Sequence, residues 1–262
     1  MGRLDDKVAI VTGGGRGLGR AIAEGYAREG ARVVVTAARN KGEIDSFAEQ
    51  WGTEIALAVL ADVADPSACA HVVEETIKRF GHIDVLVNNA GRGMLFVSPH
   101  FLTEPTRFWQ VDPATWKMII DTNVTGPFLM ARAVAPHMLS RKTGAIINLT
   151  MNYETMRRKG FSPYGPSKAA LESETIIWAK DLEGTGITVN EILPGGATET
   201  GMIPPQTPEA IRRKLLTAEI IVPPAVYLAS EVGRRTTGRR IVAQGWTPER
   251  PEGTSAEDGI GI

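Results

Sequence analysis

A glycine-rich segment between an apolar strand and a helix constrains the fold of this chain more than any other feature. Residues 7–12 form a short apolar run that predicts a buried strand, and residues 17–29 have the periodicity of a helix that stops at Gly30. Glycines let the intervening chain turn tightly against a pyrophosphate, and the free N–H groups of the helix attract anions. We therefore predict a dinucleotide-binding turn whose cofactor contacts are Gly13, Gly15, Arg16, Gly17, Leu18 and Gly19.

Strand and helix patterns alternate along the rest of the chain. Short apolar runs predict strands at 7–12, 33–35, 54–60, 85–87, 145–149, 187–193 and 239–243. Helical patterns lie between them at 17–29, 42–51, 66–80, 112–139 (with a disturbance at Gly126-Pro127), 163–183, 209–216 and 225–230. The strands are continuously apolar rather than alternating, which is typical of a parallel sheet covered by helices on both faces.

The alternation indicates one domain of the α/β class. We find no internal repeat and no linker that would divide the chain, so we expect a single domain over residues 1–247. The segment 248–262 is rich in Gly, Pro, Glu and Asp, and we predict that this tail is disordered.

Composition excludes several classes of protein. The 29 basic and 30 acidic residues give a net charge of -1, which argues against a nucleic-acid surface. The single cysteine, Cys69, cannot form an intrachain disulfide, and the four histidines share no metal-ligand spacing, so we expect no metal site. No apolar run approaches the roughly 20 residues of a membrane span, and the N-terminus does not resemble a signal peptide. We therefore expect a cytoplasmic protein without membrane contact.

The end of the second predicted strand favours one nicotinamide cofactor over the other. A carboxylate there would bind the ribose 2′-hydroxyl of NAD, but residues 36–40 contain none. Arg16 and Arg39 could instead reach a 2′-phosphate, so we predict NADP(H) in preference to NAD(H). Arg39 could alternatively be a solvated surface residue. Further predicted contacts follow the third and fourth strands at Asp62, Val63, Asn89, Ala90 and Gly91.

A tyrosine and a lysine four residues apart form a candidate catalytic pair. Tyr164 and Lys168 share one face of the predicted helix 163–183. A phenol has an ordinary pKa near 10, and a nearby ammonium group would lower that pKa. The pair could then exchange a proton with a carbonyl or alcohol oxygen.

Taken together, these motifs resemble the short-chain dehydrogenase/reductase family over about residues 5–246. Asn123 and Pro194-Gly195 also occur in the family's order and spacing. The resemblance implies a Rossmann-type, doubly wound parallel sheet of about seven strands, an NADP-dependent oxidoreductase, and a homodimer or homotetramer. It implies Tyr164 as the general acid/base, Lys168 as a contact of the nicotinamide ribose and Asn123 as the holder of a relay water. It places Pro194, Gly195 and Thr198 beside the nicotinamide, so Tyr164 and Lys168 are predicted cofactor contacts as well.

One departure from the family's pattern concerns a catalytic hydroxyl. The family normally has a serine roughly 12–14 residues before the tyrosine, where this chain has Thr150-Met151-Asn152. Methionine cannot donate a hydrogen bond, so we expect the Asn152 amide to substitute, with the Thr150 hydroxyl as the alternative. Two other hypotheses stay open: a catalytically weak NADP-binding protein, and a reductase of imines or activated double bonds.

Two long loops are candidates for the substrate side. Residues 91–111 and 195–224 carry many apolar side chains, which predicts either a pocket for a small molecule with apolar parts or subunit contacts. The basic run Arg157-Arg158-Lys159 precedes Tyr164 by a few residues. We expect it to be a solvated turn rather than a site for an acidic substrate.

Overall fold

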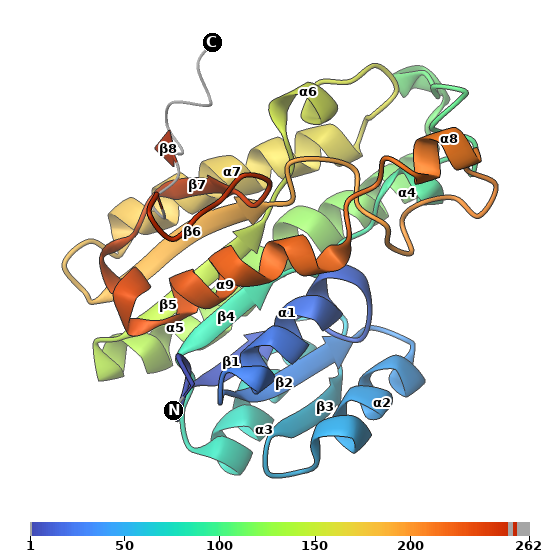
Figure 1. The fold of residues 1–262 in the computed structure, drawn as a ribbon. Helices are drawn as coiled ribbons and strands as arrows, with labels where there is room; N and C mark the ends of the chain where they lie inside the picture. Colours follow the sequence, from blue (N-terminus) through green and yellow to red (C-terminus); the bar gives the residue numbers. More distant parts are fainter. Residues whose placement is uncertain (1, 251–253, 256–262) are drawn as a thin grey trace.

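The parallel sheet at the centre of the molecule explains where its pocket lies. The structure is a computed structural model that describes residues 2–250 and 254–255. Within these residues the sheet has the order β3-β2-β1-β4-β5-β6-β7-β8, and β1 to β7 run parallel (Figure 1). The strands are β1 (Val8–Val11), β2 (Arg32–Ala37), β3 (Ala56–Leu60), β4 (Val85–Asn88), β5 (Gly144–Leu149), β6 (Ile187–Leu193), β7 (Arg239–Val242) and β8 (Thr254–Ser255).

Successive residues of a strand point to opposite faces of the sheet, and here both sets are apolar. Helices therefore cover both faces. Ala9 and Val11 of β1 belong to a core cluster with residues of α1 (Gly17–Arg28), α2 (Lys41–Trp51) and α9 (Val222–Ala229). Ile10, between them, belongs to a second cluster with residues of α3 (Pro66–Phe80), α5 (Gly126–Arg141) and α7 (Tyr164–Asp181). The predicted Rossmann-type, doubly wound α/β fold with seven parallel strands is confirmed.

The chain reverses its direction of travel across the sheet next to β1. It moves outward from β1 through β2 to the edge strand β3, and then returns to lay β4 on the other side of β1. In such a fold, ligands bind beyond the carboxyl ends of the strands at this switch point. The residues after β1 and β4 are therefore placed around one crevice.

Several elements differ from the sequence-based expectation. The predicted helix 112–139 is α4 (Pro113–Ile120), a π-helical turn η3 (Asp121–Thr125) and α5, and the predicted helix 209–216 shortens to α8 (Glu209–Arg212). The helix α6 (Tyr153–Met156) was not predicted. Four 3₁₀ turns complete the described elements: η1 (Met94–Phe96), η2 (Phe108–Gln110), η4 (Ala218–Ile221) and η5 (Glu231–Arg235).

The predicted disordered tail is described only in part. Thr254 and Ser255 pair antiparallel with β7 as strand β8, so this short piece has regular structure. Residues 251–253 and 256–262, on which the prediction also falls, lie outside the described residues.

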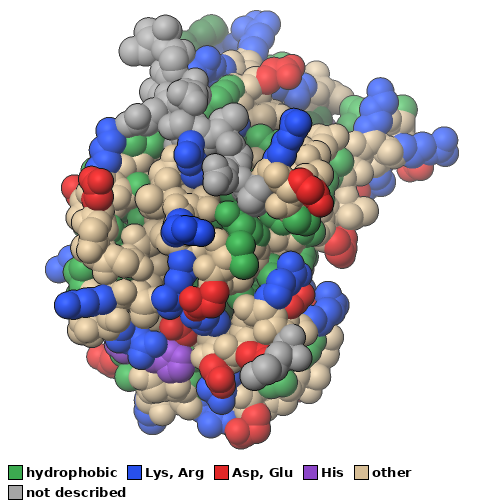
Figure 2. Space-filling view, turned by 60° about the vertical axis from the view of Figure 1, so that its left-hand side comes forward, with side chains coloured by type: hydrophobic (Ala, Val, Ile, Leu, Met, Phe, Trp, Pro, Cys, Tyr) green, Lys and Arg blue, Asp and Glu red, His purple; other side chains and the backbone are tan. Residues whose placement is uncertain are grey.

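Figure 2 shows basic and acidic side chains intermixed over one face of the molecule. Across residues 2–250 and 254–255, no helix is long and apolar enough to cross a bilayer. The same residues contain no group of three His, Cys, Asp or Glu side chains that could hold a metal ion.

Candidate active site

The glycine-rich turn adopts a backbone that suits an anion at the start of α1. Gly13 and Gly17 have φ angles of +63° and +54°, a region that residues with a Cβ rarely adopt. The N-cap residue of α1, Arg16, makes no capping hydrogen bond through its side chain. The first N–H groups of α1 are therefore not satisfied by a side-chain cap, and they point, with the positive end of the helix dipole, toward the crevice.

Asn89 braces this turn from the end of β4. Its Nδ2 donates to the carbonyl oxygens of Thr12 and Gly13, at 2.8 and 3.1 Å. The Thr12 hydroxyl oxygen in turn accepts hydrogen bonds from the backbone N–H groups of Asn89 and Ala90, both at 3.0 Å. A Cβ on Gly19 would lie only 2.3 Å from Asn89 Nδ2, so glycine at position 19 lets α1 pack closely on the braced turn.

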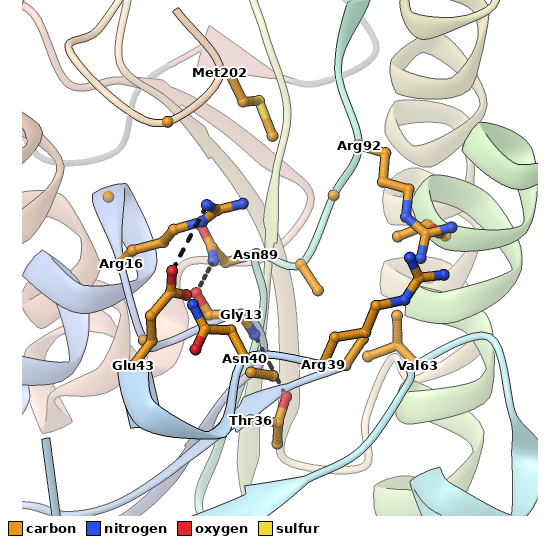
Figure 3. Close-up of a pocket in the computed structure, with 18 of the residues that line it drawn as sticks. Gly13, Arg16, Thr36, Arg39, Asn40, Glu43, Val63, Asn89, Arg92 and Met202 are labelled. Atoms are coloured by element: carbon orange, nitrogen blue, oxygen red, sulfur yellow. Dashed lines mark hydrogen bonds and ion pairs between the residues drawn. The ribbon is translucent and has the colours of Figure 1, made fainter. Parts of the chain in front are cut away.

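A pocket of about 300 Å³ lies at the carboxyl ends of the strands (Figure 3). It contains most of the predicted cofactor contacts, namely Gly13, Gly15, Arg16, Gly17, Leu18, Arg39, Asp62, Val63, Asn89, Ala90 and Gly91. Gly19, Tyr164, Lys168, Pro194, Gly195 and Thr198 do not line it. The pocket therefore gathers the residues predicted around the phosphates and adenosine, and the residues predicted around the nicotinamide lie outside it.

Three arginines face the pocket, and their pairing differs. Arg16 lies 3.7 Å from Glu43, and Arg92 lies 3.7 Å from Asp62. Arg39 has no ion pair with any described carboxylate. Figure 3 shows the Arg39 and Arg92 guanidinium groups near one another, across the pocket from Arg16 and Glu43. This side of the pocket therefore presents an excess of positive charge.

The loop after β6 belongs to the segment 195–224 that was predicted on the substrate side, but three of its residues were not predicted in this pocket. Thr200, Gly201 and Met202 line the pocket, and Thr200 lies against the glycine turn. The Thr200 methyl group lies 3.3 Å from the position of a Cβ on Gly17, and a Cβ on Gly201 would lie 3.3 Å from the Arg16 guanidinium. Thr198 is buried nearby and forms a parallel bridge with Leu216, which ties the loop back on itself. The sequence predicts an apolar loop here, but it carries no signal that this loop passes beside Gly17 and Arg16.

Lys168 is buried and oriented by the backbone. Its Nζ donates to the carbonyl oxygen of Leu149 at 2.6 Å, and a Cβ on Gly91 would lie 3.9 Å from the same Nζ. Burial lowers the pKa of Lys168 to about 8, and the Glu191 carboxylate partly opposes this shift. Lys168 therefore lies beside the residue that closes β4 and keeps its proton at neutral pH.

Tyr164 begins α7 and packs against an apolar cluster of Met94, Phe101 and Phe161. Burial raises the pKa of Tyr164 to about 12. The expected lowering of this pKa by the lysine is wrong, because the loss of solvent around the phenol raises the pKa. Tyr164 is consequently a protonated phenol, and hence a proton donor, at neutral pH.

Asn123 lies in the π-helical turn and is fully buried. Its Oδ1 accepts from the Arg92 N–H at 2.8 Å, while its Nδ2 donates to the Arg92 carbonyl oxygen and to Ser167 Oγ, both at 2.9 Å. The side chain thus joins the segment after β4 to the first turn of α7. These bonds fix Asn123 beside Gly91, and its role as the holder of a relay water stays a prediction.

The segment where the family carries its serine offers two polar side chains, Asn152 and the buried Thr150. Asn152 caps α6, since its Oδ1 accepts from the Thr155 N–H at 3.1 Å, and its Nδ2 lies 3.4 Å from the Gly195 carbonyl oxygen. Thr150 is buried, and its hydroxyl lies beside the Glu191 carboxylate. Met151 packs against the apolar cluster that contains Tyr164. Of the polar groups in this segment, the second N–H of the Asn152 amide is therefore the donor most available to a substrate oxygen.

A buried group of charges under this segment was not predicted. Arg240 Nε lies 3.2 Å from Glu172 and 3.4 Å from Glu191, and its Nη2 donates to the Met151 carbonyl oxygen at 3.2 Å. The Tyr153 hydroxyl donates to Glu172, and Arg240 lies over the Tyr153 ring at 4.0 Å. The available signal was Glu191, a charged residue inside the buried strand β6.

Comparisons with known proteins agree with this geometry. A family model described as short chain dehydrogenase matches residues 7–210. A 3-oxoacyl-[acyl-carrier-protein] reductase of Synechocystis is 37% identical over 198 residues, covering 74% of this chain and 76% of the relative. An uncharacterised oxidoreductase of Mycobacterium tuberculosis is 34% identical and covers 94% of this chain and 93% of its own. The crystal structure of a 3-ketoacyl-(acyl-carrier-protein) reductase from Brucella melitensis with NADH superimposes with a TM-score of 0.80, at 29% identity, over 91% of this chain and 96% of that chain.

Proposed function

This chain belongs to the short-chain dehydrogenase/reductase family of nicotinamide-dependent oxidoreductases, and we propose that it is an NADPH-dependent reductase of a ketone on an acyl chain. The observation that carries the proposal is that Tyr164 lies one helical turn before the buried Lys168, whose Nζ lies beside Gly91 in the lining of the dinucleotide pocket. The apolar side chains packed around Tyr164 favour a substrate with apolar parts. The reductases named among its relatives act on 3-oxoacyl substrates, which supports the same class here.

The pocket fits a dinucleotide phosphate. The start of α1 has no side-chain cap, the glycine turn leaves space beside it, and Arg39 carries a charge without an ionic partner in the described chain. We infer that the first turn of α1 binds the pyrophosphate and that Arg39, with Arg16, binds the 2′-phosphate of NADP(H). Asp62 and Val63 would contact the adenine, and Pro194, Gly195 and Thr198 the nicotinamide side.

The chemistry assigned to the chain itself is proton transfer and orientation. When bound, the reduced cofactor supplies the hydride. Tyr164 Oη donates its proton to the carbonyl oxygen as negative charge develops there, and its raised pKa keeps that proton available at neutral pH. Lys168 Nζ, held by Leu149, stabilises the resulting phenolate and contacts the nicotinamide ribose. Asn123 fixes the segment that carries Gly91 and holds the relay water that restores the proton.

Asn152 is proposed to take the place of the absent serine. Only one hydrogen of its Nδ2 faces Gly195, across a long 3.4 Å contact, and the second can donate to the substrate oxygen. An amide is a neutral donor, as a serine hydroxyl is, so it can stabilise a developing alkoxide.

Replacing Tyr164 by phenylalanine tests the reductase assignment. We expect Tyr164→Phe to lower kcat/KM for NADPH-dependent ketone reduction by roughly 100-fold or more, because it removes the general acid. The matched control is Tyr227→Phe, which removes a hydroxyl that contacts Thr236 at 2.7 Å. Enones and imines are assayed beside the ketones. Turnover of these alone, or unchanged ketone reduction in Tyr164→Phe, would contradict the assignment.

Replacing Arg39 tests the cofactor preference. We expect Arg39→Gln to raise the KM for NADPH roughly tenfold or more while leaving the KM for NADH nearly unchanged, because only NADPH has a 2′-phosphate to lose a charged contact. Arg28→Gln, at an arginine on α1 that is 59% exposed, is the control for loss of one positive charge. An equal rise in the KM for NADPH and for NADH would show that Arg39 does not bind the 2′-phosphate.

The cytoplasmic location and the assembly into a homodimer or homotetramer stay predictions. Exposed apolar residues on α4, α5 and α7 support an assembly, because Trp116, Phe128 and Ile177 are 44%, 46% and 49% exposed.

A further inference from the structure

A second groove, of about 330 Å³, lies between η2 and the loop that joins α6 to α7. One wall carries Arg107, Phe108 and Trp109, and the other carries Arg157, Arg158 and Lys159. We refer to these six residues as the basic groove. Phe108 and Trp109 are 71% and 69% exposed, and their rings meet edge to face with centroids 5.1 Å apart. Two large aromatic rings thus stand open to solvent beside four positive charges.

The charges of the basic groove are not neutralised by the protein. No Asp or Glu lines the groove, and none of its four cations has an ion pair with a described carboxylate. Other arginines on the surface are paired with carboxylates, as Arg213 is with Glu209 and Arg28 with Glu24. Four like charges around one concavity repel one another, and an anion bound between them would remove that repulsion.

The two guanidinium groups of the loop are held in place by aromatic rings. Arg157 lies over the Tyr153 ring at 5.5 Å, and Arg158 lies over the Phe161 ring at 5.3 Å. Stacking of this kind uses the flat face of a guanidinium and leaves its N–H edges available for an anion. The arginines are therefore oriented without having their donors occupied by carboxylates.

The two walls of the groove are fixed against each other. Gly160 has a φ angle of +82°, and a Cβ at this position would lie 2.7 Å from the Pro105 side chain. The basic loop thus docks closely on the segment that leads to Arg107. The groove is therefore formed by close packing between its two walls.

The basic groove borders the substrate side of the candidate active site. Phe161 lines the groove and also belongs to the apolar cluster against which Met151 and Tyr164 pack. Its ring meets the Phe101 ring edge to face at 5.8 Å. A substrate whose reacting carbonyl lies at Tyr164 could therefore pass over this cluster and place its far end in the groove.

We propose that the acyl substrate carries a nucleotide and that the basic groove binds this part of it. The phosphates would contact the four cations, and the base would stack on Phe108 or Trp109. This inference rests on the proposed function for the position of the reacting carbonyl. Phosphate oxygens suit guanidinium donors, and exposed aromatic rings stack on a nucleobase. The proposal assigns a binding role to Arg157-Arg158-Lys159, which the sequence predicts to be a solvated turn.

The kinetic test compares two thioesters of the same 3-oxoacyl group. One carries coenzyme A, which has the phosphates and the base, and the other carries the short neutral thiol N-acetylcysteamine. The test variant is Arg157→Gln/Arg158→Gln/Lys159→Gln. The control variant, Arg28→Gln/Lys78→Gln/Arg235→Gln, removes three positive charges from exposed positions elsewhere. We expect the test variant to raise KM for the coenzyme A thioester roughly tenfold or more, with little change for the neutral thioester or in the control. An unchanged ratio of kcat/KM between the two thioesters would overturn the proposal.

A binding test separates this proposal from the reductase assignment. Coenzyme A without an acyl group is titrated into the protein saturated with NADPH, and binding is measured by calorimetry for the wild type, the test variant and Trp109→Ala. Binding that both variants weaken supports the groove even if no carbonyl is reduced. If the protein reduces ketones but does not bind coenzyme A, the proposal for the basic groove is overturned and the reductase assignment stands.

Phosphopantetheine, which has a phosphate but no base, is titrated in parallel. If phosphopantetheine binds as tightly as coenzyme A, the aromatic rings do not bind a base. The proposal that the ligand is a nucleotide is then overturned.

Discussion

Met151 stands where members of the family carry a hydroxyl that donates to the reacting oxygen. Its thioether packs with the apolar cluster around Tyr164 instead. The residues on either side do not simply replace the hydroxyl, because Thr150 is buried against Glu191 and Asn152 caps α6. We therefore expect the reacting oxygen to depend on Tyr164 and on one hydrogen of the Asn152 amide.

Restoring the hydroxyl should raise the rate. We expect Met151→Ser to increase kcat/KM for ketone reduction roughly tenfold or more, because a second aligned donor stabilises the developing alkoxide. Met151→Ala is the matched control, since it removes the thioether without adding a donor. Steady-state assays of both variants give the answer, and a serine variant no faster than the alanine variant would mean that the site already has its full set of donors.

At the residue scale, the sequence predicts the cofactor turn well and the chemistry near Lys168 less well. The glycines and Asn89 follow from local geometry, because a tight turn and its brace need particular residue types. The pKa values of Tyr164 and Lys168 depend on how much solvent the folded chain removes from them. For Tyr164, that quantity depends on packing against Met94 and Phe101, which lie far from it in the sequence, in a loop without periodicity.

At the scale of elements, the contact between β6 and β7 is unusual because it contains charges. Glu191 pairs in register with Arg240 across these strands, and both side chains are buried. Glu172 on α7 completes the group, with Tyr153 as its hydroxyl donor. The arginine therefore connects two strands, one helix and the backbone at Met151.

Removing the arginine alone should be costly. We expect Arg240→Met to lower the free energy of unfolding by about 3–5 kcal/mol, because it leaves the buried carboxyl groups of Glu172 and Glu191 without their partner. The double variant Glu191→Val/Arg240→Met should lose less than Arg240→Met, since it removes one of these carboxyl groups as well. Urea unfolding measures both, with Arg239→Met on the same strand as the control. A double variant less stable than Arg240→Met would contradict this account.

The strands and long helices follow from apolar periodicity, whereas the elements that differ from prediction are governed by tertiary contacts. The π-helical turn at η3 forms where Asn123 binds Arg92 and Ser167, two partners that are distant in sequence. The short helix α6 begins at the Asn152 cap within a stretch that has no apolar repeat. Neither feature has a pattern that could be recognised before the partners are known.

At the scale of the whole molecule, one buried carboxyl links folding to pH. Burial, reinforced by the neighbouring Glu172, raises the pKa of Glu191 from 4.5 to about 9. The folded protein thus holds a proton that the unfolded chain releases between these values. The stabilisation from that proton is complete below pH 4.5 and is lost as the pH rises through 9.

The melting temperature should therefore respond to pH through this residue. We expect the wild type to lose stability between pH 5 and 9 relative to Glu191→Gln, whose amide does not titrate. Lys168 contributes the opposite trend above pH 8 in both proteins, because burial lowers its pKa to about 8. Thermal melts across this range are the measurement, and parallel curves for the two proteins would rule out Glu191 as the linked group.

The pairing of β8 with β7 has a consequence for how molecules of this chain meet one another. An edge strand presents unpaired N–H and C=O groups that can template the addition of a strand from another molecule. Thr254 and Ser255 run antiparallel along β7 and take up hydrogen-bonding groups at Arg239 and Arg240. The edge of the sheet therefore passes at these positions from β7 to β8, a strand of only two residues, which offers a second copy a much shorter template than β7 would.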